Sequence, residues 1–365
     1  MAGSDTGSAP SPVPPTEVLL AASVARRFYL DNLSKVEIAE EFDISRFKVA
    51  RLLEAAVAQG IVEISITVPA EIDARLSAAM RRRFGLQHAI VVRAPAQDPA
   101  GPEPVTDWLG PVAAQLIAEI VEPDDVLGLA WGRAVSSVSE GFTKLPPCTV
   151  VQLTGVHPLE AINANSVEAV RKTAAISGGK SYPIYAPLVL PNKLTADILR
   201  CQPGIAESLD QFNQVTKAVV GIGGWGPTLS TVYDALCEEE REMYGRLGVV
   251  AEMAALLFGS DGSVIRTDLD ERTISVTNEQ LVRIPEVIGV AGGAQKAEAI
   301  GAVLTSGLLT GIVTDRAAAL QILSVPPSCD PTVRDTARRP PTRAATGAIM
   351  RDTSAAVPLE AVRVG

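Results

Sequence analysis

The sequence has little of the chemistry that would build a metal centre. Only two histidines are present, His88 and His157, and the cysteines are scattered with no CxxC pair. A zinc site of Cys and His ligands needs such residues at short spacing, so we expect no metal and no other cofactor. Isolated cysteines are typical of a reducing cytoplasm, where they pack as small apolar side chains. They are Cys148, Cys201, Cys237 and Cys329.

Long apolar runs and a signal sequence are also missing. No uninterrupted apolar stretch reaches the roughly 18 residues of a membrane span, and the first 15 residues are rich in Ser, Pro, Gly and Ala. We therefore expect a soluble, cytoplasmic protein with no membrane partner. Aromatic residues make up only 4% of the chain, which disfavours a flat slot for a nucleotide base.

Positive charge is in short supply as well. The 32 Lys and Arg are outnumbered by 42 Asp and Glu, giving a formal net charge of −10. This balance excludes a surface that coats nucleic acid throughout, but one locally basic helix remains compatible with DNA binding. At 365 residues, 47% of them hydrophobic, the chain is long enough for two domains with sizeable cores.

Changes in composition and periodicity divide the chain into five segments. They are a disordered leader (1–15), a short helical domain (16–68), a linker helix (69–86), a large domain (87–324) and a disordered tail (325–365). The linker helix ends in the basic run Arg81, Arg82 and Arg83, whose simplest interpretation is a solvated helix end. The tail is rich in Pro, Arg, Thr and Ala and has no sustained apolar period.

The large segment alternates short apolar runs with helical stretches. Strands are predicted at 89–92, 126–130, 149–153, 184–190, 217–223, 287–293 and 309–315. Helices are predicted at 107–121, 165–176, 194–200, 228–243 and 294–306. Such alternation is typical of βαβ units, so we expect an α/β fold with a largely parallel sheet covered by helices on both faces.

Residues 35–53, KVEIAEEFDISRFKVARLL, have the spacing of a helix-turn-helix. Ala39 allows two helices to cross closely, and Asp43 stands where the turn needs a positive φ, which Asp tolerates better than most residues. Ile44 would plug the turn into the core, and Ser45 would cap the second helix. The apolar face of that helix consists of Val49, Leu52 and Leu53.

The outward face of the second helix carries the candidate DNA contacts. After Ser45, the exposed positions are Arg46, Phe47, Lys48 and Arg51. They lie in the N-terminal half of a recognition helix, which enters the major groove and places Arg and Lys at guanine edges or phosphates. The alternative is an ordinary helical hairpin with a charged face.

Three strand ends in the large segment carry glycine turns. At Gly132, free backbone N–H groups favour an anion, and Arg133 and Ser136 add donors. At Gly293, the following helix brings Lys296 into its first turns. Asp315 ends a further strand and can accept hydrogen bonds from hydroxyl groups. Because open α/β sheets bind ligands at the carboxyl ends of their strands, a ligand site is predicted there.

The remaining glycine turn contains GxGxxG at Gly221, Gly223 and Gly226. This spacing also occurs in dinucleotide-binding folds, where a helix follows and an acidic residue ends a strand about 20 positions on. Here Pro227 follows at once and residues 238–240 continue a helical stretch. We therefore expect no NAD site.

Together these stretches resemble the SorC-type (sugar-binding, DeoR-like) transcriptional regulators. The resemblance rests on GLAWGR, YPIYAPLVL, VGIGGW, VIGVAGGAQKAEAI and GLLTGIVTD, and it covers residues 17–323. It implies an N-terminal helix-turn-helix DNA-binding domain and a large α/β effector domain that resembles phosphosugar isomerases and deaminases. It also implies a phosphorylated sugar or polyol as effector, double-stranded operator DNA as partner, and a homo-oligomer, either dimer or tetramer.

The resemblance also implies a set of effector contacts. They are Gly132, Arg133, Ser136, Gly223, Glu252, Gly293, Lys296 and Asp315. Three neighbouring positions depart from the family pattern. Ala134 and Ala318 stand where Thr is usual, and Arg316 stands where an acidic residue is usual.

These features predict a DNA-binding transcriptional regulator of carbohydrate metabolism, without catalytic residues, whose operator binding is modulated by a phosphorylated sugar or polyol. One alternative is a phosphosugar isomerase or deaminase-like enzyme with an N-terminal DNA-binding appendage. His157 is the acid–base candidate of that alternative, although a structural role in a turn fits it better. The other alternative is a DNA-binding scaffold whose departures from the family pattern have abolished the effector site.

Overall fold

The computed structural model describes residues 15–64, 71–93, 105–157, 166–326 and 362–364. The chain folds into two compact units. One comprises residues 1–68 with 345–365, and the other comprises residues 69–344. In the described ranges, no helix is long and apolar enough to cross a membrane.

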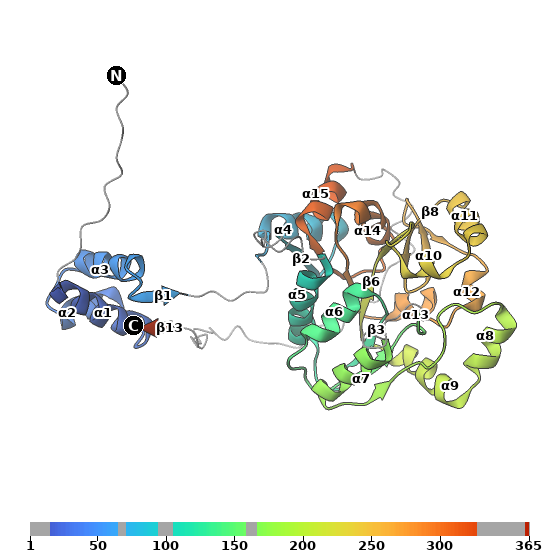
Figure 1. Ribbon diagram of the computed structural model, residues 1–365, viewed down its shortest axis with the longest axis horizontal. Helices are drawn as coiled ribbons and strands as arrows, with labels where there is room; N and C mark the ends of the chain where they lie inside the picture. The colour runs from blue at the N-terminus through green and yellow to red at the C-terminus, as the bar shows by residue number, and fades with distance from the viewer. Residues whose placement is uncertain (1–14, 65–70, 94–104, 158–165, 327–361, 365) are drawn as a thin grey trace, which may run out of the picture. The chain divides into compact units, whose positions relative to one another are not determined.

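The smaller unit is built from three helices around one apolar cluster (Figure 1). The helices are α1 (Pro15–Tyr29), α2 (Lys35–Glu41) and α3 (Arg46–Ala58). Val24, Ile38 and Val49, one from each helix, are fully buried together. These three helices lie in the region where the sequence predicts a short helical domain.

A two-stranded antiparallel ladder completes the smaller unit. Strand β1 (Val62–Ile64) pairs with β13 (Val362–Val364) in the register Glu63 opposite Arg363. The sequence predicts a tail without structure from 325 onward, and the pairing of β13 differs from that expectation. Alternation of apolar residues in VRV is too short to be recognised as a strand without its partner.

The larger unit contains a seven-stranded parallel sheet in the order β2-β12-β11-β6-β3-β4-β5 (Figure 1). The strands are β2 (His88–Val92), β3 (Val126–Leu129), β4 (Thr149–Gln152), β5 (Ser181–Tyr182), β6 (Lys217–Gly221), β11 (Glu286–Val290) and β12 (Gly311–Asp315). The α/β fold with a parallel sheet is therefore confirmed. Such strands are apolar and buried because helices cover both faces of the sheet.

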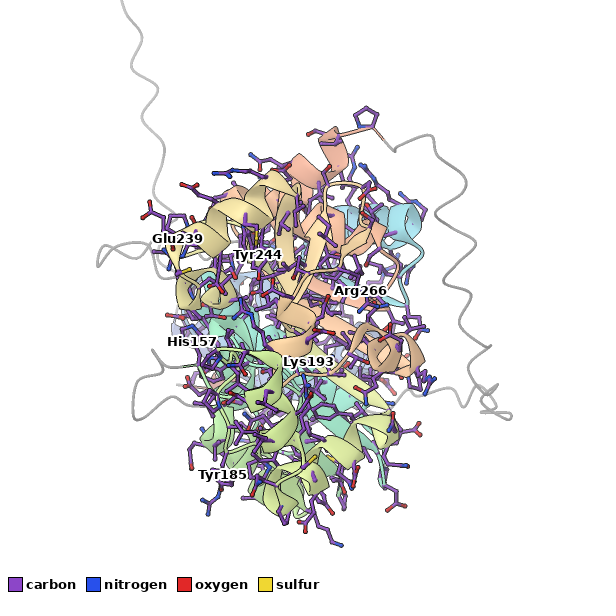
Figure 2. All side chains as sticks on the ribbon, turned by 90° about the vertical axis from the view of Figure 1, so that its right-hand side faces the viewer. His157, Tyr185, Lys193, Glu239, Tyr244 and Arg266 are labelled. Carbon is purple, nitrogen blue, oxygen red and sulfur yellow. The ribbon has the colours of Figure 1, made fainter. Side chains whose placement is uncertain are left out.

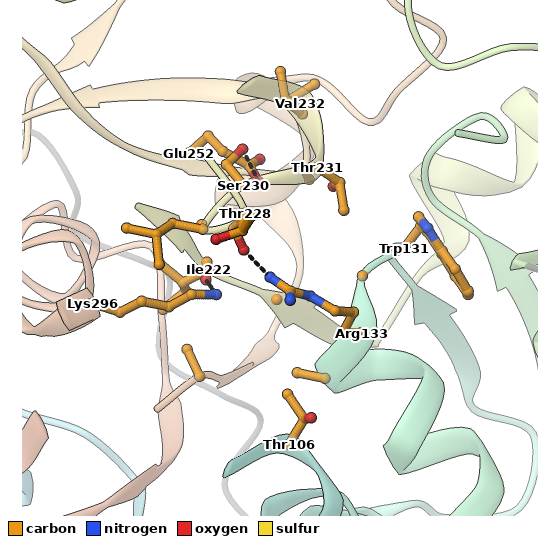
Figure 3. A pocket seen from close by; sticks show the side chains of 18 of the residues that line it. Thr106, Trp131, Arg133, Ile222, Thr228, Ser230, Thr231, Val232, Glu252 and Lys296 are labelled. Atoms are coloured by element: carbon orange, nitrogen blue, oxygen red, sulfur yellow. Dashed lines mark hydrogen bonds between the residues drawn. The ribbon is translucent and has the colours of Figure 1, made fainter. Parts of the chain in front are cut away.

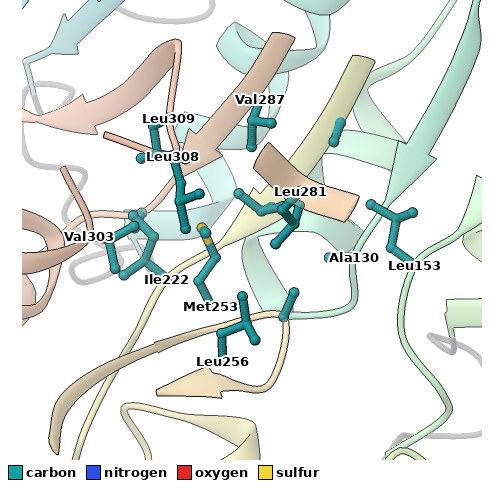
Figure 4. Close-up of a cluster of buried hydrophobic side chains, with 14 of the residues drawn as sticks. Ala130, Leu153, Ile222, Met253, Leu256, Leu281, Val287, Val303, Leu308 and Leu309 are labelled. Carbon is teal, nitrogen blue, oxygen red and sulfur yellow. The ribbon is translucent and has the colours of Figure 1, made fainter. Parts of the chain in front are cut away.

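Two apolar clusters mark the two faces of this sheet. The first includes Met80, Ile300 and Ile322, from α4 (Ala74–Phe84), α14 (Ala297–Thr305) and α15 (Arg316–Ser324); part of it is drawn in Figure 4. The second cluster is formed by α5 (Val105–Ile120), α6 (Arg133–Gly141) and α7 (Ser166–Ser177). Helix α4, which the sequence suggests as a linker, packs as part of this unit because Met80 is fully buried in its core.

A second, antiparallel sheet of four strands adjoins the parallel one. Its order is β10-β9-β8-β7, with β7 (Gly223–Gly224), β8 (Val249–Met253), β9 (Leu256–Gly259) and β10 (Val264–Ile265). The chain enters this sheet directly from β6, since only Ile222 separates β6 from β7. This sheet is not among the elements predicted from the sequence.

Two predicted elements of the large unit are wrong in detail. The helix expected at 228–243 is two helices, α10 (Thr231–Ala235) and α11 (Glu238–Arg246). The strand expected at 184–190 is not formed, because these residues make only isolated bridges. Their side chains are partly buried and partly exposed, with Tyr185 66% exposed (Figure 2). Prolines 183, 187 and 191 lack the N–H groups that a ladder needs.

Short helices complete the larger unit around these sheets. They are α8 (Lys193–Arg200), α9 (Pro203–Asp210), η1 (Gln211–Gln214), α12 (Leu269–Arg272), α13 (Asn278–Arg283) and η2 (Ala294–Lys296).

The amino-terminal edge of the parallel sheet holds a nearly buried charge cluster. The Lys217 Nζ atom, at the start of β6, lies 3.1 Å from an oxygen of Asp125 and 3.1 Å from an oxygen of Glu286. The Thr216 hydroxyl donates a further hydrogen bond of 2.7 Å to Asp125. Each of these charges therefore has a partner within the sheet, as a buried charge requires.

Candidate nucleic-acid interface and ligand cavity

Helix α3 begins with the geometry that the sequence predicts. Asp43 has φ 49°, in the left-handed region that the turn requires. The Ser45 hydroxyl accepts a 3.2 Å hydrogen bond from the Lys48 N–H and so caps the helix. Such a cap is worth about 1 kcal/mol relative to alanine. Val49, Leu52 and Leu53 are buried, which fixes the face of α3 that remains outside.

That outer face carries three cations and one aromatic ring. Arg46, Phe47, Lys48 and Arg51 are all exposed. Phe47 is 72% exposed, and the Arg46 guanidinium lies 5.1 Å from its ring centroid. The first turns of α3 therefore present donors suited to guanine edges and phosphates next to an apolar group suited to a thymine methyl.

The larger unit contains a cavity of about 370 Å³ at the carboxyl edge of its parallel sheet (Figure 3). Its walls include the turn after β3, the β6–β7 passage with the loop and helix α10 after it, the β8–β9 turn and the turn after β11, together with the start of α5, Thr154 and Leu188. Its lining residues include Thr106, Trp131, Gly132, Arg133, Ala134, Thr154, Leu188, Ile222, Gly223, Thr228, Ser230, Thr231, Val232, Glu252, Ala254, Ala255, Gln295 and Lys296. The size and position suit a small ligand.

Two cations from different turns converge on this cavity. Arg133, the first residue of α6, donates to the carbonyl of Thr228, and the Lys296 Nζ donates to the carbonyl of Ile222 at 3.0 Å (Figure 3). Burial and, secondarily, the positive charge of Arg133 lower the pKa of Lys296. The two cations therefore repel each other across a partly dry space, and an anion between them would relieve this repulsion.

The start of α6 adds backbone donors beside these cations. Gly132 is its N-cap, and no side chain caps the first N–H groups of the helix. Gly132 and Ala134 both line the cavity. Helix N-termini with free N–H groups bind phosphate and other anions, so the cations and the helix end favour the same kind of ligand.

Glu252, on β8, lies deeper in the cavity. Its Oε1 atom accepts a 3.0 Å hydrogen bond from the Ser230 hydroxyl, and burial raises the pKa of its carboxyl. Gly223 makes this arrangement possible, because a Cβ there would lie 2.5 Å from Glu252 Oε1 and 2.7 Å from Ser230 Cβ. A buried carboxyl of this kind exchanges hydrogen bonds with hydroxyl groups of a ligand.

Five of the eight predicted effector positions line the cavity, namely Gly132, Arg133, Gly223, Glu252 and Lys296. Ser136, Gly293 and Asp315 are not among the lining residues. The two carboxylate oxygens of Asp315 accept hydrogen bonds from the N–H groups of Gly293 and Ala317, at 2.7 and 3.0 Å. Asp315 therefore holds the Gly293 turn in place, and Ser136 lies within α6.

Of the three departures from the family pattern, one lies in the cavity wall and two lie outside it. Ala134 lines the cavity, whereas Arg316 and Ala318 do not. Arg316 is exposed near Asp73, and Ala318 is fully buried. His157 also lies outside the cavity lining.

The lining residues that are not predicted from the sequence include Ser230, Thr228 and Trp131. Ser230 caps α10 by accepting from the Tyr233 N–H at 3.1 Å, a local signal that points to a helix start and not to a ligand. The GxGxxG glycines belong to β6, β7 and the loop after them instead of a strand followed by a helix. The geometry of a dinucleotide turn is therefore not present there.

This fold and these two sites define a helix-turn-helix unit joined to a ligand-binding α/β unit. A family model described as "Putative sugar-binding domain" matches residues 68–324. The chain is 29% identical over 315 residues to the transcriptional regulator LsrR of Klebsiella pneumoniae, covering 84% of this chain and 93% of that protein. It is 26% identical over 301 residues to the deoxyribonucleoside regulator of Bacillus subtilis, covering 81% and 95%.

Solved structures show the same fold. The full-length sorbitol operon regulator SorC from Klebsiella pneumoniae superposes with a TM-score of 0.63 at 23% identity, over 84% of this chain and 99% of that chain. A DeoR family transcriptional regulator from Listeria monocytogenes superposes with a TM-score of 0.60 at 25% identity, over 68% and 98%. The chain belongs to this sugar-binding-domain family of SorC-type transcriptional regulators.

Proposed function

We propose that this protein is a transcriptional regulator of carbohydrate metabolism that binds operator DNA through α3. Its operator binding changes when a phosphorylated sugar or polyol occupies the cavity. The relatives named as regulators support the DNA-binding part, and the exposed Arg46, Lys48 and Arg51 supply the chemistry for it.

The convergence of Arg133 and Lys296 carries the effector part of the proposal. They come from turns more than 160 residues apart in sequence and meet at one cavity. Beside them, α6 begins without a side-chain cap. Two cations and free N–H groups suit a phosphate, and Glu252 suits a hydroxyl further along the same ligand.

Binding, and not catalysis, is the function that the cavity supports best. Among the described residues that line it, Glu252 is the single carboxyl and there is no histidine. Isomerisation or deamination of a phosphosugar needs a positioned acid–base pair, and the two cavity groups that could form one, Glu252 and Lys296, are hydrogen-bonded to Ser230 and to the Ile222 carbonyl. An isomerase assay with ribose, fructose and hexosamine phosphates checks this part directly, and turnover would contradict it.

We further propose that the protein acts as a homo-oligomer, either dimer or tetramer. Helix-turn-helix proteins bind two half-sites, one helical turn apart, through two copies of the recognition helix. Sedimentation velocity of the full chain, with and without operator DNA, would measure this. A monomer on DNA would contradict it.

The central test is a thermal-shift screen of the full chain. Sugar phosphates, polyol phosphates and their unphosphorylated parents are compared, since a ligand that binds the folded state raises the melting temperature. We expect a rise with phosphorylated ligands that Lys296→Ala abolishes. Gel shifts with DNA selected from a random pool should show that Lys296→Ala still binds DNA.

Lys172→Ala is the matched control, because Lys172 is an exposed lysine on α7 outside the cavity. It should retain the full thermal shift. If the free sugars raise the melting temperature and the phosphates do not, the phosphate role of Arg133 and Lys296 is wrong. If the wild type selects no DNA sequence, the regulator role is wrong.

A further inference from the structure

The cavity has two unlike ends. At the opening, Arg133 and Thr228 are exposed and Lys296 is partly buried. At the inner end, Leu188, Val232 and Ala255 are only 3%, 2% and 4% exposed, yet all three line the cavity. A phosphate held by the cations would therefore lie near the opening, and the rest of the ligand would extend inward.

The inner end is the surface of an apolar core. Leu188, Val232 and Ala255 belong to one hydrophobic cluster, together with Tyr244 and Leu257. Figure 3 shows Val232 at the end of the cavity remote from Lys296, with Ser230 and Glu252 drawn between them. A ligand that reaches past Glu252 would meet aliphatic side chains.

Two of the hydroxyl groups near this end, those of Ser230 and Thr154, already have partners within the protein, whereas Thr231, which also lines the cavity, is drawn between Val232 and Arg133 (Figure 3). The Ser230 hydroxyl accepts from the Tyr233 N–H at 3.1 Å and donates to Glu252 at 3.0 Å. The Thr154 hydroxyl accepts from the Trp131 N–H at 2.9 Å. A ligand hydroxyl placed among Leu188, Val232 and Ala255 would lose its water without gaining an equivalent partner from these side chains, which is costly.

The backbone of the turn between β8 and β9 also supports an apolar inner end. Ala254 and Ala255 form the tight turn between β8 and β9 with φ values of 51° and 65°, the left-handed region in which glycine or asparagine is usual. Both alanines line the cavity. The chain thus places two alanines in the cavity wall at positions where glycine would relieve the backbone strain. Strain of this kind concentrates at ligand sites.

We infer that the cavity selects a phosphorylated sugar or polyol whose end remote from the phosphate is apolar, a methyl or deoxy carbon in place of a hydroxymethyl group. The inference rests on the proposed function, because the phosphate sets the direction of the ligand. It adds a chemical class to the effector: a terminally deoxygenated sugar phosphate.

The test uses pairs of ligands that differ by one hydroxyl. Fructose, tagatose and sorbose 1-phosphates are each compared with their 6-deoxy counterparts by calorimetric titration of the full chain. We expect each deoxy compound that binds to bind about ten- to a hundredfold tighter than its partner, the discrimination that an apolar pocket gives against an added hydroxyl.

Val232→Thr tests whether the inner wall is responsible. This exchange keeps the shape of the side chain and adds a hydroxyl, so we expect it to reduce the preference for the deoxy compounds by about tenfold. Val189→Thr is the matched control. Val189 packs against the same cluster but does not line the cavity, and its variant should retain the wild-type preference.

Each result decides a separate point. Equal affinities within the pairs, or tighter binding of the hydroxylated members, would overturn the apolar end and leave the phosphate effector intact. An unchanged preference in Val232→Thr would remove the inner wall as its cause. If none of the six phosphates binds while the free sugars do, the proposed phosphate effector fails together with this inference.

Discussion

The face of α3 and the cavity solve recognition in opposite ways. The candidate DNA contacts Arg46, Phe47, Lys48 and Arg51 lie within six consecutive residues and are all exposed. The cavity combines Arg133, Gly223, Glu252 and Lys296, which are separated by up to 163 residues, and Gly223 and Glu252 are buried. One surface is a local property of a helix; the other exists only after two sheets have assembled.

The comparison predicts how each region responds to substitution. On α3, removal of an exposed side chain should affect binding and leave folding unchanged, because these side chains pack against little. In the cavity, the side chains that would bind the ligand also hold one another in place, so a substitution should affect the fold and the site together.

The largest effect is expected from the triple variant Arg46→Ala, Lys48→Ala, Arg51→Ala. Loss of one base contact costs about 1–3 kcal/mol, so the triple variant should lose at least about 3 kcal/mol of specific binding. The measurement is a gel-shift isotherm on DNA selected by the wild type, with urea unfolding to check that stability is unchanged.

A triple variant in the larger unit serves as the control for net charge. Arg171→Ala, Lys172→Ala, Lys180→Ala removes the same three charges from exposed positions outside the cavity. Its affinity for the selected DNA should stay near that of the wild type. An unchanged isotherm for the α3 variant would show that this helix does not read DNA.

Gly223→Ala is expected to have the next largest effect. The new Cβ would lie 2.5 Å from Glu252 Oε1 and 2.7 Å from Ser230 Cβ, and overpacking of this kind costs about 1–3 kcal/mol. Urea unfolding measures the loss, and the thermal shift with a phosphorylated ligand should disappear as well. Gly204→Ala, where a Cβ meets no atom within 4 Å, should be close to neutral. Equal stabilities for the two variants would mean that Gly223 is not under steric constraint.

The smallest effect concerns the pH dependence of stability through Glu252. Burial raises the pKa of this carboxyl above its ordinary value of 4.5. The folded chain therefore keeps the proton where the unfolded chain releases it. Its contribution to stability is full below about pH 4.5 and is lost as pH rises through the raised pKa. Relative to Glu252→Gln, wild-type stability should fall with rising pH by at most about 1.4 kcal/mol per pH unit.

Urea unfolding of the wild type and of Glu252→Gln between about pH 4 and about pH 8 measures this difference, because the range begins below the ordinary pKa of a glutamate. Glu207→Gln, at an exposed position on α9, is the control and should run parallel to the wild type. Parallel curves for Glu252→Gln as well would show that burial does not shift this carboxyl.

The helix-turn-helix was predictable from sequence because its signals are local. Asp43 adopts the positive φ that the turn spacing requires, and Ser45 caps the helix that it precedes. The role of each residue follows from its immediate neighbours. The parallel strands were predictable for a similar reason, since a run such as VVQL or GIVT is buried on both faces.

The antiparallel sheet was not predictable because its turn carries no turn signal. Strands β8 and β9 are joined by Ala254 and Ala255, where Asn-Gly or a similar pair is usual. The run VVAEMAALLFG therefore resembles one apolar segment. The cavity is hard to predict because its residues meet only in the folded chain. The family resemblance alone points to Glu252, and nothing local shows that the oxygens of Asp315 accept from the N–H groups of Gly293 and Ala317.

The two edges of the parallel sheet treat their positive charges differently. At the amino edge, Lys217 is neutralised by Asp125 and Glu286, which belong to the protein. At the carboxyl edge, Arg133 and Lys296 donate to carbonyl oxygens, and Glu252 is the one carboxylate among the described residues that line the cavity with them. The protein thus neutralises the positive charge at the amino edge with two carboxylates of its own, whereas at the carboxyl edge it leaves two cations on neutral carbonyl groups. A doubly charged anion bound at the carboxyl edge would neutralise Arg133 and Lys296, as Asp125 and Glu286 permanently neutralise Lys217.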